Sequence, residues 1–342
     1  MTIVRCDESH APAWAQFVSS NERASVYHRW EWRAINERAF GHETVYLAAL
    51  DRGTVVGVLP LVRMRSTLFG NVGCSMPFVN YGGPCGLTDA IERDLLAAAE
   101  TVADDWKADY LEIRSRRDLG ERYPSSLHKV SMTIELDPDP EVVMGRMKRE
   151  HRQDIRRALK RGFVTRFGRE HLEDFYDVLS ESWRDLGTPI YQLSYFKAIV
   201  DAMPDAVRLC VLYGPAGEAL AGAFYAVHNG VVEGMWLGMR PAARQAMAGY
   251  VLYWETIRES CEAGHRRYHL GRSSKDSSAE TFKRKWNAEA EQLYWHFYLR
   301  DRSELPGLNP DNPKYRMAIA AWRRLPVAVT QAIGPYIARS IP

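Results

Sequence analysis

The feature that most constrains the fold is an order of secondary-structure signals that occurs twice along the 342 residues. In each half, two amphipathic helical segments precede a β-hairpin, then another helix and a further strand. The hairpin turns begin at residues 51 and 214, and the strands after the last helix begin at 110 and 268, so the offset is about 160 residues in both cases. A nearly constant offset predicts a duplicated unit that contains both helices and strands.

The expected elements follow from hydrophobic periodicity and from the turn-forming residues between the periodic segments. The stretch from residue 70 to 86 is rich in Gly and Pro and is expected to be a loop. The expected helices span residues 11–19, 29–40 and 90–107 in the first half and 172–186, 194–203 and 248–263 in the second. The expected strands span residues 2–5, 45–50, 55–64, 110–114 and 130–136, and then 207–213, 219–228, 231–239 and 268–270.

Composition narrows the class of protein. Apolar residues make up 46% and charged residues 26% of the chain, which is ordinary globular usage and argues against a disordered chain. The length fits two domains, and a net charge of +2 argues against a dedicated nucleic-acid coat protein. Neither the five cysteines nor the histidines have metal-ligand spacing, so we expect no metal site. We expect a cytoplasmic protein, because neither a signal-peptide pattern nor an apolar run of membrane-spanning length is present.

Basic residues concentrate between residues 270 and 286. A strand-like run leads into this segment and a helix-like run, residues 279–287, follows. Cations beside the N-terminus of a helix suit an anionic group such as a phosphate or a carboxylate. A solvated charged turn has the same composition, so the segment alone leaves both interpretations open. Its cations are Arg272, Lys275, Lys283, Arg284 and Lys285, with Ser273 and Ser274 among them.

A second basic segment, residues 140–162, is expected to form one long helix between the two halves. Asp139 and Pro140 suit its first turn and Gly162 suits its end. Its apolar residues form one stripe, and basic residues that include Arg152 and Arg156 form the opposite stripe. Such a helix is either a solvated link between two domains or a basic surface that attracts an anionic substrate.

Two further segments have the composition of ligand-facing loops. The loop 76–84 combines a Gly-Gly turn with Asn80 and Tyr81, whose side chains can donate hydrogen bonds. The turn 187–191 lies between two helices and ends in Tyr191. Taken singly, each is also consistent with a packed loop or a plain turn.

In order along the chain, five segments resemble the FemAB family of peptidyltransferases: residues 77–84, 152–162, 187–191, 270–274 and 282–286. The resemblance is to the branch associated with bacterial exosortase and PEP-CTERM systems. It implies an α/β (α+β) fold of two tandem GNAT-like acyltransferase domains with mixed, mostly antiparallel sheets. The implied division is residues 1–138, residues 139–302, which open with the basic helix, and a C-terminal helical tail at 303–342.

Members of this family transfer an acyl or aminoacyl group to an amine of a cell-envelope precursor, typically from aminoacyl-tRNA and without a tightly bound cofactor. The resemblance implies that Lys283 or Lys285 stabilises negative charge in the reaction or on a nearby phosphate. Lys283 is the stronger candidate, because the family's Phe-Lys motif lies at the active site. The implied substrate-binding residues are Arg272, Ser273, Asn80, Tyr81, Tyr191, Arg152 and Arg156.

The sequence leaves two alternative functions open. One is an acyl-CoA-dependent acyltransferase of exopolysaccharide biosynthesis, although the loop 240–249 matches a CoA-binding loop only through Gly249 and a preceding Arg244 or Gln245. The other is a catalytically inactive binding protein with the same fold. Two departures from the branch favour it. His269 stands where the branch usually has an acidic residue, and Asn287 stands where it usually has a glycine.

The C-terminal segment, residues 313–342, is apolar with flanking arginines, and we expect Pro326 and Pro335 to break it. It is expected either to pack on the domains or to contact the inner face of a membrane near a lipid-linked precursor. The donor, the acceptor and the oligomeric state do not follow from the sequence.

Overall fold

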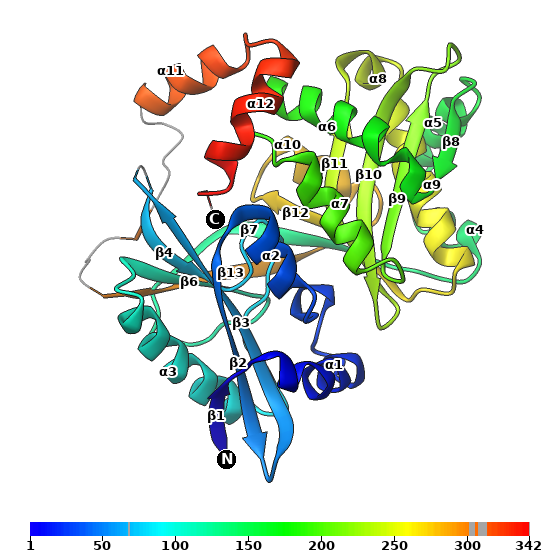
Figure 1. The fold of residues 1–342 in the computed structure, drawn as a ribbon. Helices are drawn as coiled ribbons and strands as arrows, with labels where there is room; N and C mark the ends of the chain where they lie inside the picture. The colour runs from blue at the N-terminus through cyan, green and yellow to red at the C-terminus, as the bar shows by residue number, and fades with distance from the viewer. Residues whose placement is uncertain (68, 301–304, 307–312, 342) are drawn as a thin grey trace. The chain divides into compact units, whose positions relative to one another are not determined.

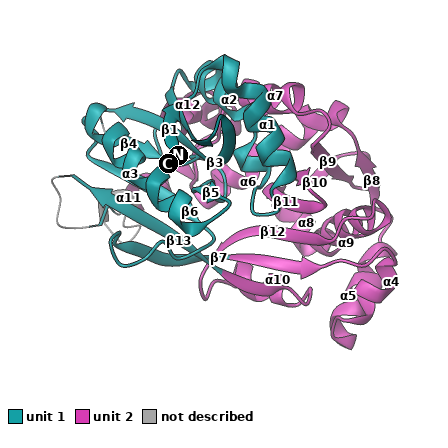
Figure 2. Ribbon diagram, turned by 90° about the horizontal axis from the view of Figure 1, so that it is seen from below, with its two compact units in different colours: residues 1–130, 292–307, 339–342 teal, residues 131–291, 308–338 magenta. Residues whose placement is uncertain are grey.

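The computed structural model describes residues 1–67, 69–300, 305–306 and 313–341 (Figure 1). The chain folds into two compact units, which are coloured separately in Figure 2. Unit 1 consists of Met1–Val130, Gln292–Gly307 and Arg339–Pro342, and unit 2 of Ser131–Glu291 and Leu308–Ala338. The chain passes from unit 1 to unit 2 within strand β7 (Ser125–Glu135) and back within strand β13 (Glu289–Leu299).

The sheet of unit 1 has the strand order β1-β2-β3-β4-β6-β13. The hairpin between β2 and β3 turns at Arg52 and Gly53, which both have positive φ angles, as a tight two-residue hairpin requires. All neighbouring pairs are antiparallel except β4 and β6, which are parallel. The strands are β1 (Thr2–Arg5), β2 (Glu43–Asp51), β3 (Thr54–Ser66), β4 (Gly70–Cys74) and β6 (Tyr110–Ser115), and β5 (Cys85–Gly86) adds a short pair to β3.

Both faces of this sheet are covered by helices. Leu47 and Ala49 of β2 pack in the cluster that contains Leu95 and Leu96 of α3, whereas Tyr46 of β2 packs in the cluster that contains α1. Successive side chains of a strand point to opposite faces, so one strand serves two cores. The helical elements are η1 (Glu8–His10), α1 (Ala11–Ser20), η2 (Val26–His28), α2 (Trp32–Phe40) and α3 (Asp89–Asp105).

Unit 2 repeats this plan, with the strand order β12-β11-β10-β9-β8 and a parallel pair, β11 and β12, at the position equivalent to β4 and β6. Helix α6 packs on β10 and β11, where Gly238 allows close approach: a Cβ there would lie 2.7 Å from the Leu179 Cα. The strands are β8 (Val164–Phe167), β9 (Val207–Tyr213), β10 (Ala219–His228), β11 (Val231–Met239) and β12 (Arg267–Ser274). The main helices are η3 (Arg169–His171), α6 (Leu172–Leu186), α7 (Leu193–Ala202) and α9 (Ala248–Glu262). The expected α/β fold with a duplicated unit is confirmed.

One expected helix is wrong, the long helix at 140–162. The structure has two helices there, α4 (Pro140–Gly145) and α5 (Arg149–Leu159). Helix α4 ends at Gly145, a poor helix former, and Lys148 then has an extended backbone with ψ of 145°. Met147, between the two helices, is buried, so the break allows an apolar side chain to enter the core.

Several further expectations differ from the structure. The expected loop 70–86 contains two strands, β4 and β5, and the expected strand 268–270 continues to Ser274. The short helices α8 (Pro241–Gln245) and α10 (Ser278–Arg284) and the strands β8 and β13 have no counterpart in the expected list, although α10 begins one residue before the helix-like run noted in the sequence. Pro335 lies inside α12 (Val327–Ala338) and does not end it.

The compact units do not coincide with the expected domains 1–138, 139–302 and 303–342. Strand β13 pairs with β6, which places most of it in unit 1, and α12 packs on α6 of unit 2. Within α12, Gly334 lies against the backbone of Ile190, where a Cβ would come within 3.0 Å of its nitrogen. The other C-terminal helix is α11 (Pro313–Trp322), and in the part of the chain that the structure describes no helix is both long and apolar enough to cross a bilayer.

Candidate functional site

The candidate site is built around the two parallel strands of unit 2. Among the described residues, β11 and β12 are paired only from Val231↔Arg267 to Glu233↔His269, although both strands continue beyond this point. Gly271, with φ of +77°, follows the last pair, and a Cβ on it would lie 2.8 Å from the Gly234 oxygen. A glycine is therefore required where the two strands separate.

Lys283 of α10 reaches this point. Its side chain is buried, and its Nζ donates hydrogen bonds to the carbonyl oxygens of Gly271 and Arg272 at 2.9 and 3.2 Å. Burial, reinforced by the positive charge of Arg272, lowers the pKa of the Lys283 amine to about 7. The amine can therefore exchange a proton near neutral pH, which an exposed lysine cannot do. Lys283 is not a solvated surface charge.

Helix α10 is held in place by its own sequence. Ser277 is its N-cap, and the Ser277 Oγ accepts a hydrogen bond from the Glu280 backbone N–H. Glu280 in turn accepts from the Asp276 backbone N–H at 2.6 Å and from Arg284 at 2.9 Å. These contacts fix the turn between β12 and α10, so that Lys283 points back to the strand while Lys285 lies on the exposed side.

Two other expected site residues near Lys283, Arg272 and Ser273, lie on β12. Ser273 is buried and its Oγ has no hydrogen-bond partner among the described residues. Arg272 is half-buried. The structure thus brings Arg272, Ser273 and Lys283 together at the end of β12. A cation, a hydroxyl and an amine with a pKa near 7 are groups that can bind an anion and move a proton.

The two departures from the resembled branch are both accommodated. His269 is fully buried, its Nδ1 is 2.8 Å from the Thr133 Oγ1, and its Nε2 is 3.9 Å from a carboxylate oxygen of Glu233, its partner on β11. The adjacent strand therefore supplies a carboxylate beside the position where the branch has one. Asn287 has φ of +59°, a left-handed conformation that glycine adopts freely and asparagine tolerates. Neither residue is an argument for an inactive protein.

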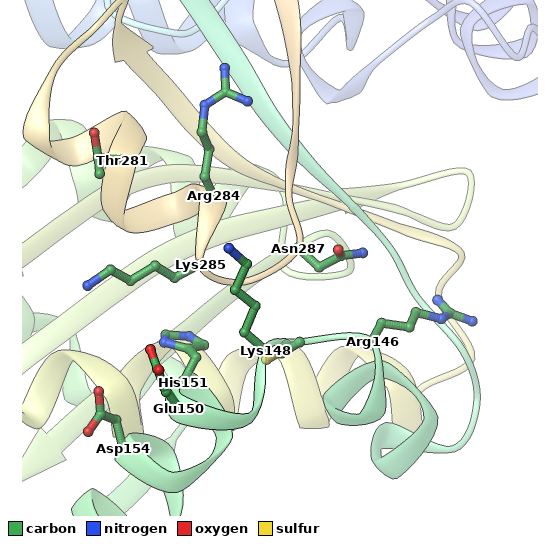
Figure 3. A pocket seen from close by; sticks show the side chains of 10 residues that line it. Arg146, Lys148, Glu150, His151, Asp154, Thr281, Arg284, Lys285 and Asn287 are labelled. Atoms are coloured by element: carbon green, nitrogen blue, oxygen red, sulfur yellow. The ribbon is translucent and has the colours of Figure 1, made fainter.

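A pocket of about 390 Å³ lies on the other side of α10, between it and the start of α5 (Figure 3). Figure 3 shows Lys148 rising from α5 toward the turn that carries Lys285 and Asn287. Four cationic side chains and two carboxylates line the pocket. Two of the cations, Arg146 and Arg284, form ion pairs with Asp137 and Glu280 outside the lining, so Lys148 and Lys285 are the cations that remain for a ligand. The charged lining residues are Arg146, Lys148, Arg284 and Lys285, and Glu150 and Asp154.

His151 forms part of the pocket wall. It is 4% exposed, and neither ring nitrogen has a hydrogen-bond partner in the part of the chain that the structure describes. Its ring packs edge-on against Trp286, with ring centres 4.6 Å apart, and also contacts Tyr250. Burial, and secondly the charge of Lys285, lowers the pKa of His151 to about 4, so the ring is neutral at pH 7.

The remaining expected site residues lie elsewhere. Arg152 donates to the carbonyl oxygens of Gly145 and Met147 at 3.1 and 2.8 Å, so it satisfies the end of α4. Arg156 is exposed on α5, and Tyr191 is buried among aromatic rings that include Trp183 and Trp236. A binding role for these three residues stays a prediction.

Asn80 and Tyr81 lie within unit 1 and are buried there. The Asn80 amide donates to the hydroxyl of Tyr27 at 2.9 Å, and the ring of Tyr81 packs edge-on against that of Tyr27. The guanidinium of Arg116 lies 5.4 Å from the centre of the Tyr81 ring. Their role in substrate binding also stays a prediction.

Sequence reasoning missed the pocket residues Arg146, Lys148, His151, Asp154 and Thr281. The first four lie about 130 residues from α10 in the sequence, and only folding brings them together. One signal was available: Met-Gly-Arg-Met-Lys at 144–148 contains a glycine in the middle of the expected helix, which marks a helix end. Among the described residues, no group of three or more His, Cys, Asp or Glu side chains is placed to hold a metal ion.

Comparison with known proteins identifies the fold of this site. Residues 145–284 match the family model of the acetyltransferase (GNAT) domain. Unit 2 contains a GNAT acyltransferase domain. The matched range contains both separating strands and the pocket lysine Lys148, and it ends one residue after Lys283.

Solved structures extend the similarity beyond this GNAT domain. FemX has a TM-score of 0.65 at 15% identity, over 88% of this chain and 98% of FemX. A tandem GNAT protein from the clavulanic acid biosynthesis pathway has a TM-score of 0.54 at 13% identity, over 86% of this chain and 97% of the other. L-PGS from Bacillus licheniformis has a TM-score of 0.52 at 14% identity, over 89% and 97%. A search of curated protein sequences finds no match.

These similarities show a tandem GNAT fold, as expected from the sequence. Together with the GNAT domain match they confirm the expected class of enzyme, an acyltransferase. They also support a FemAB-like GNAT protein, without specifying its substrates. The GNAT fold implies an acyl-CoA or an aminoacyl-tRNA as co-substrate, and the exosortase and PEP-CTERM branch stays a prediction.

Proposed function

We propose that unit 2 transfers an acyl or aminoacyl group from an ester to the amine of an acceptor, with Lys283 as the group that takes up the proton of the attacking amine. The observation that carries the proposal is the buried amine of Lys283, with a pKa near 7, at the separation of β11 and β12 in a GNAT domain. The FemX-like fold supports the same reaction class.

The hydrogen bonds of Lys283 suit this role. A neutral amine has two N–H donors and one lone pair, and two carbonyl oxygens, those of Gly271 and Arg272, accept from the Nζ. Both donors are then used, and the lone pair remains to accept a proton. Sequence reasoning assigned Lys283 a different task, stabilising negative charge as a cation. The two roles predict opposite pH dependence, because the first requires the neutral amine and the second the charged one.

The proposed steps balance without a cofactor. The acceptor nitrogen attacks the ester carbonyl carbon, a C–N bond forms, and the acceptor proton passes to Lys283. The tetrahedral intermediate then collapses, the C–O bond breaks, and the proton is returned to the leaving alkoxide. Arg272 and Ser273, at the end of the same strand, are the groups we propose to hold the donor's phosphate or the reacting oxygen.

We propose an aminoacyl ester as donor in preference to acyl-CoA. A CoA pyrophosphate would need free backbone N–H groups in the loop before α9. In this chain that loop forms α8, and the N–H groups of Ala243, Arg244 and Met247 donate within residues 240–247. Gly249 packs instead on Met239, where a Cβ would come within 2.8 Å of the Met239 Cε.

The acceptor that we propose is an amine of a cell-envelope or exopolysaccharide precursor, at the cytoplasmic face of the membrane. This part of the proposal is supported by the sequence resemblance alone. Contact of α11 and α12 with that membrane belongs to it as well, and several apolar side chains there are exposed, including Met317 and Ile333.

Donor binding and transfer test the proposal together. Calorimetry with aminoacyl-tRNA is expected to show binding, and the same titration with acetyl-CoA is expected to show none. A simple amine acceptor should then yield an amide product from the aminoacyl donor, detected by mass spectrometry. One-site binding of acetyl-CoA followed by N-acylation of the amine would replace the proposal with the acyl-CoA alternative.

A further inference from the structure

The break between α4 and α5 creates a helix N-terminus that the sequence did not predict. Helix α5 has eleven residues, and its N-cap is Lys148, whose side chain makes no capping hydrogen bond. The first backbone N–H groups of an α-helix have no partner within the helix, and this end carries the positive pole of the helix dipole. A lysine is the opposite of the residue that such a position normally favours.

Further positive charge is gathered at the same point. Lys148 and Lys285 line the pocket at this helix end, and no ion pair of either is recorded among the described residues. Figure 3 shows the Lys148 amine directed toward the turn that begins at Lys285. Like charges beside a positive helix end repel one another, and Glu150 in the first turn of α5 offsets only part of this repulsion. Local features that cost stability without a structural gain are typical of binding sites.

His151 is the second, independent observation. It lies in the first turn of α5, lines the same pocket, is 96% buried, and has both ring nitrogens without a partner among the described residues. A buried polar group without a hydrogen bond is unfavourable, so the site is incomplete by itself. A neutral imidazole offers one N–H donor and one acceptor nitrogen. An oxyanion that carries a proton, such as a phosphate, can satisfy whichever of the two nitrogens faces it, because it can either accept from the N–H or donate to the other nitrogen.

The carboxylates narrow the class of ligand. Glu150 and Asp154 also line the pocket of about 390 Å³, so the positive charge available to a ligand is limited to Lys148, Lys285 and the helix end. An extended polyanion such as RNA binds along a series of cations, each of which neutralises one backbone phosphate. Two carboxylates beside the lysines would repel it, whereas a compact anion can sit between the lysines and the helix end.

We propose that the pocket formed by the N-terminus of α5 and by α10 is a binding site for a compact phosphate-class anion, held by Lys148, Lys285 and His151. Binding is independent of turnover, so the inference does not rest on the function proposed above. If that function is correct, the site provides a place at the end of α10, where Lys285 lies two residues from Lys283, for a phosphorylated part of one substrate.

Calorimetry of the full chain with pyrophosphate tests the site. We expect one binding event, weakened about tenfold or more by either Lys148→Ala or Lys285→Ala, since each removes a charge-assisted hydrogen bond. Lys160→Ala is the matched control, because Lys160 is exposed at the other end of α5, roughly 18 Å away at the helical rise per residue. It should change the affinity by less than about twofold, because charges beyond a Debye length are screened. Lys283→Met should bind pyrophosphate like the wild type, which separates this result from any loss of transfer.

His151 is followed in the wild-type protein, so the test does not depend on how a variant folds. The ring ¹⁵N resonances of His151 should shift on saturation with pyrophosphate, and His151→Phe, which keeps the packing on Trp286, should bind it about tenfold more weakly. The proposal is overturned if Lys148→Ala and Lys160→Ala weaken binding equally, or if the His151 resonances do not move. It is also overturned if a cytidine-cytidine-adenosine trinucleotide binds at this site and pyrophosphate does not.

Discussion

The two copies of the GNAT-like unit differ most where their parallel strands meet. Strand β6 has the sequence Tyr-Leu-Glu-Ile-Arg-Ser, and residues 268–273 of β12 have the sequence Tyr-His-Leu-Gly-Arg-Ser. The tyrosine, the arginine and the serine therefore occupy equivalent positions in the two strands. In unit 1 the arginine, Arg114, is fully buried, with its Nε 2.6 Å from Glu112 and its guanidinium 4.5 Å from the centre of the Trp295 ring. In unit 2 the equivalent Arg272 is half-buried.

The loop that follows β4 completes the difference. In unit 1 it returns to β6: the Arg114 backbone N–H donates to the Ser75 Oγ, and the Arg114 carbonyl accepts from the Gly82 N–H. The space beyond the paired strands is thus filled by the unit's own chain. In unit 2, Gly271 stands where unit 1 has Ile113, and Leu270 stands where it has Glu112. The side chain of Lys283 reaches this end of β12. One scaffold therefore serves structure in the first copy and, we propose, chemistry in the second.

The largest expected effect is on transfer activity. Lys283→Met should lower kcat about 10³-fold, the usual contribution of a general base, while the GNAT domain stays folded. Lys283→Arg should not restore activity, because a guanidinium does not lose its proton at neutral pH. Lys275→Met is the comparison variant, because Lys275 is exposed in the turn before α10, and an equal loss in it would remove the special role of Lys283. Product formation by mass spectrometry and far-UV circular dichroism are the two measurements.

The next effect is a difference in the free energy of unfolding between variants of the two equivalent arginines, Arg114 and Arg272. Arg114→Met leaves the Glu112 carboxylate buried without its partner and should lower the free energy of unfolding by about 3–5 kcal/mol. Arg272→Met, in the half-buried position, should lower it by less than about 1 kcal/mol. Urea unfolding of both variants decides this. The double variant Glu112→Leu/Arg114→Met should recover most of the loss, and equal losses in the two single variants would contradict the contrast.

A smaller effect follows from the buried amine. The pKa of Lys283 is about 7 in the folded protein and near 10.5 when it is unfolded, so between these values the unfolded chain binds a proton that the folded chain does not. Stability should therefore rise with pH across this window, and the penalty should be complete below pH 7. Relative to Lys283→Met, the wild type should gain up to about 1.4 kcal/mol per pH unit. A difference that stays constant from pH 7 to 10 would show that the amine is not buried as described.

The smallest effect concerns the pocket. Lys148→Ser places a good N-cap residue on α5 and removes a charge from its positive end, so unfolding should require about 1 kcal/mol more. The same variant should lose pyrophosphate affinity. Lys160→Ser, at the other end of the helix, should show neither change. A Lys148→Ser variant that is destabilised would mean that the lysine supports the fold and not a ligand.

Local signals predicted much of the fold. The strands β9, β10 and β11 begin and end where periodicity and turn residues place them, and the hairpin turn at Arg52 and Gly53 has the expected conformation. The repeated order of elements depends on the same local signals. What they could not give is the position of β13, because its pairing with β6 joins segments about 180 residues apart.

The site was predicted in part, for the same reason. Lys283, Arg272 and Ser273 lie within one short segment, so the concentration of charge there was enough to select them as candidates. The pocket needs α5 beside α10, and the amphipathic pattern of 140–162 concealed the helix break that exposes the α5 N-terminus. Arg152, which was expected to bind a substrate, donates to the carbonyl groups at that break, and its binding role stays a prediction.

The pH dependence of kcat tests most directly the claim that the second copy carries the chemistry. With saturating aminoacyl donor and an amine acceptor of low pKa, kcat should rise through an apparent pKa of about 7 and then level off, because the neutral amine of Lys283 is required. The same measurement on Arg114→Met, under conditions where it is folded, should keep this profile. A kcat that falls as the pH rises through 7, or that has no inflection there, would contradict the account.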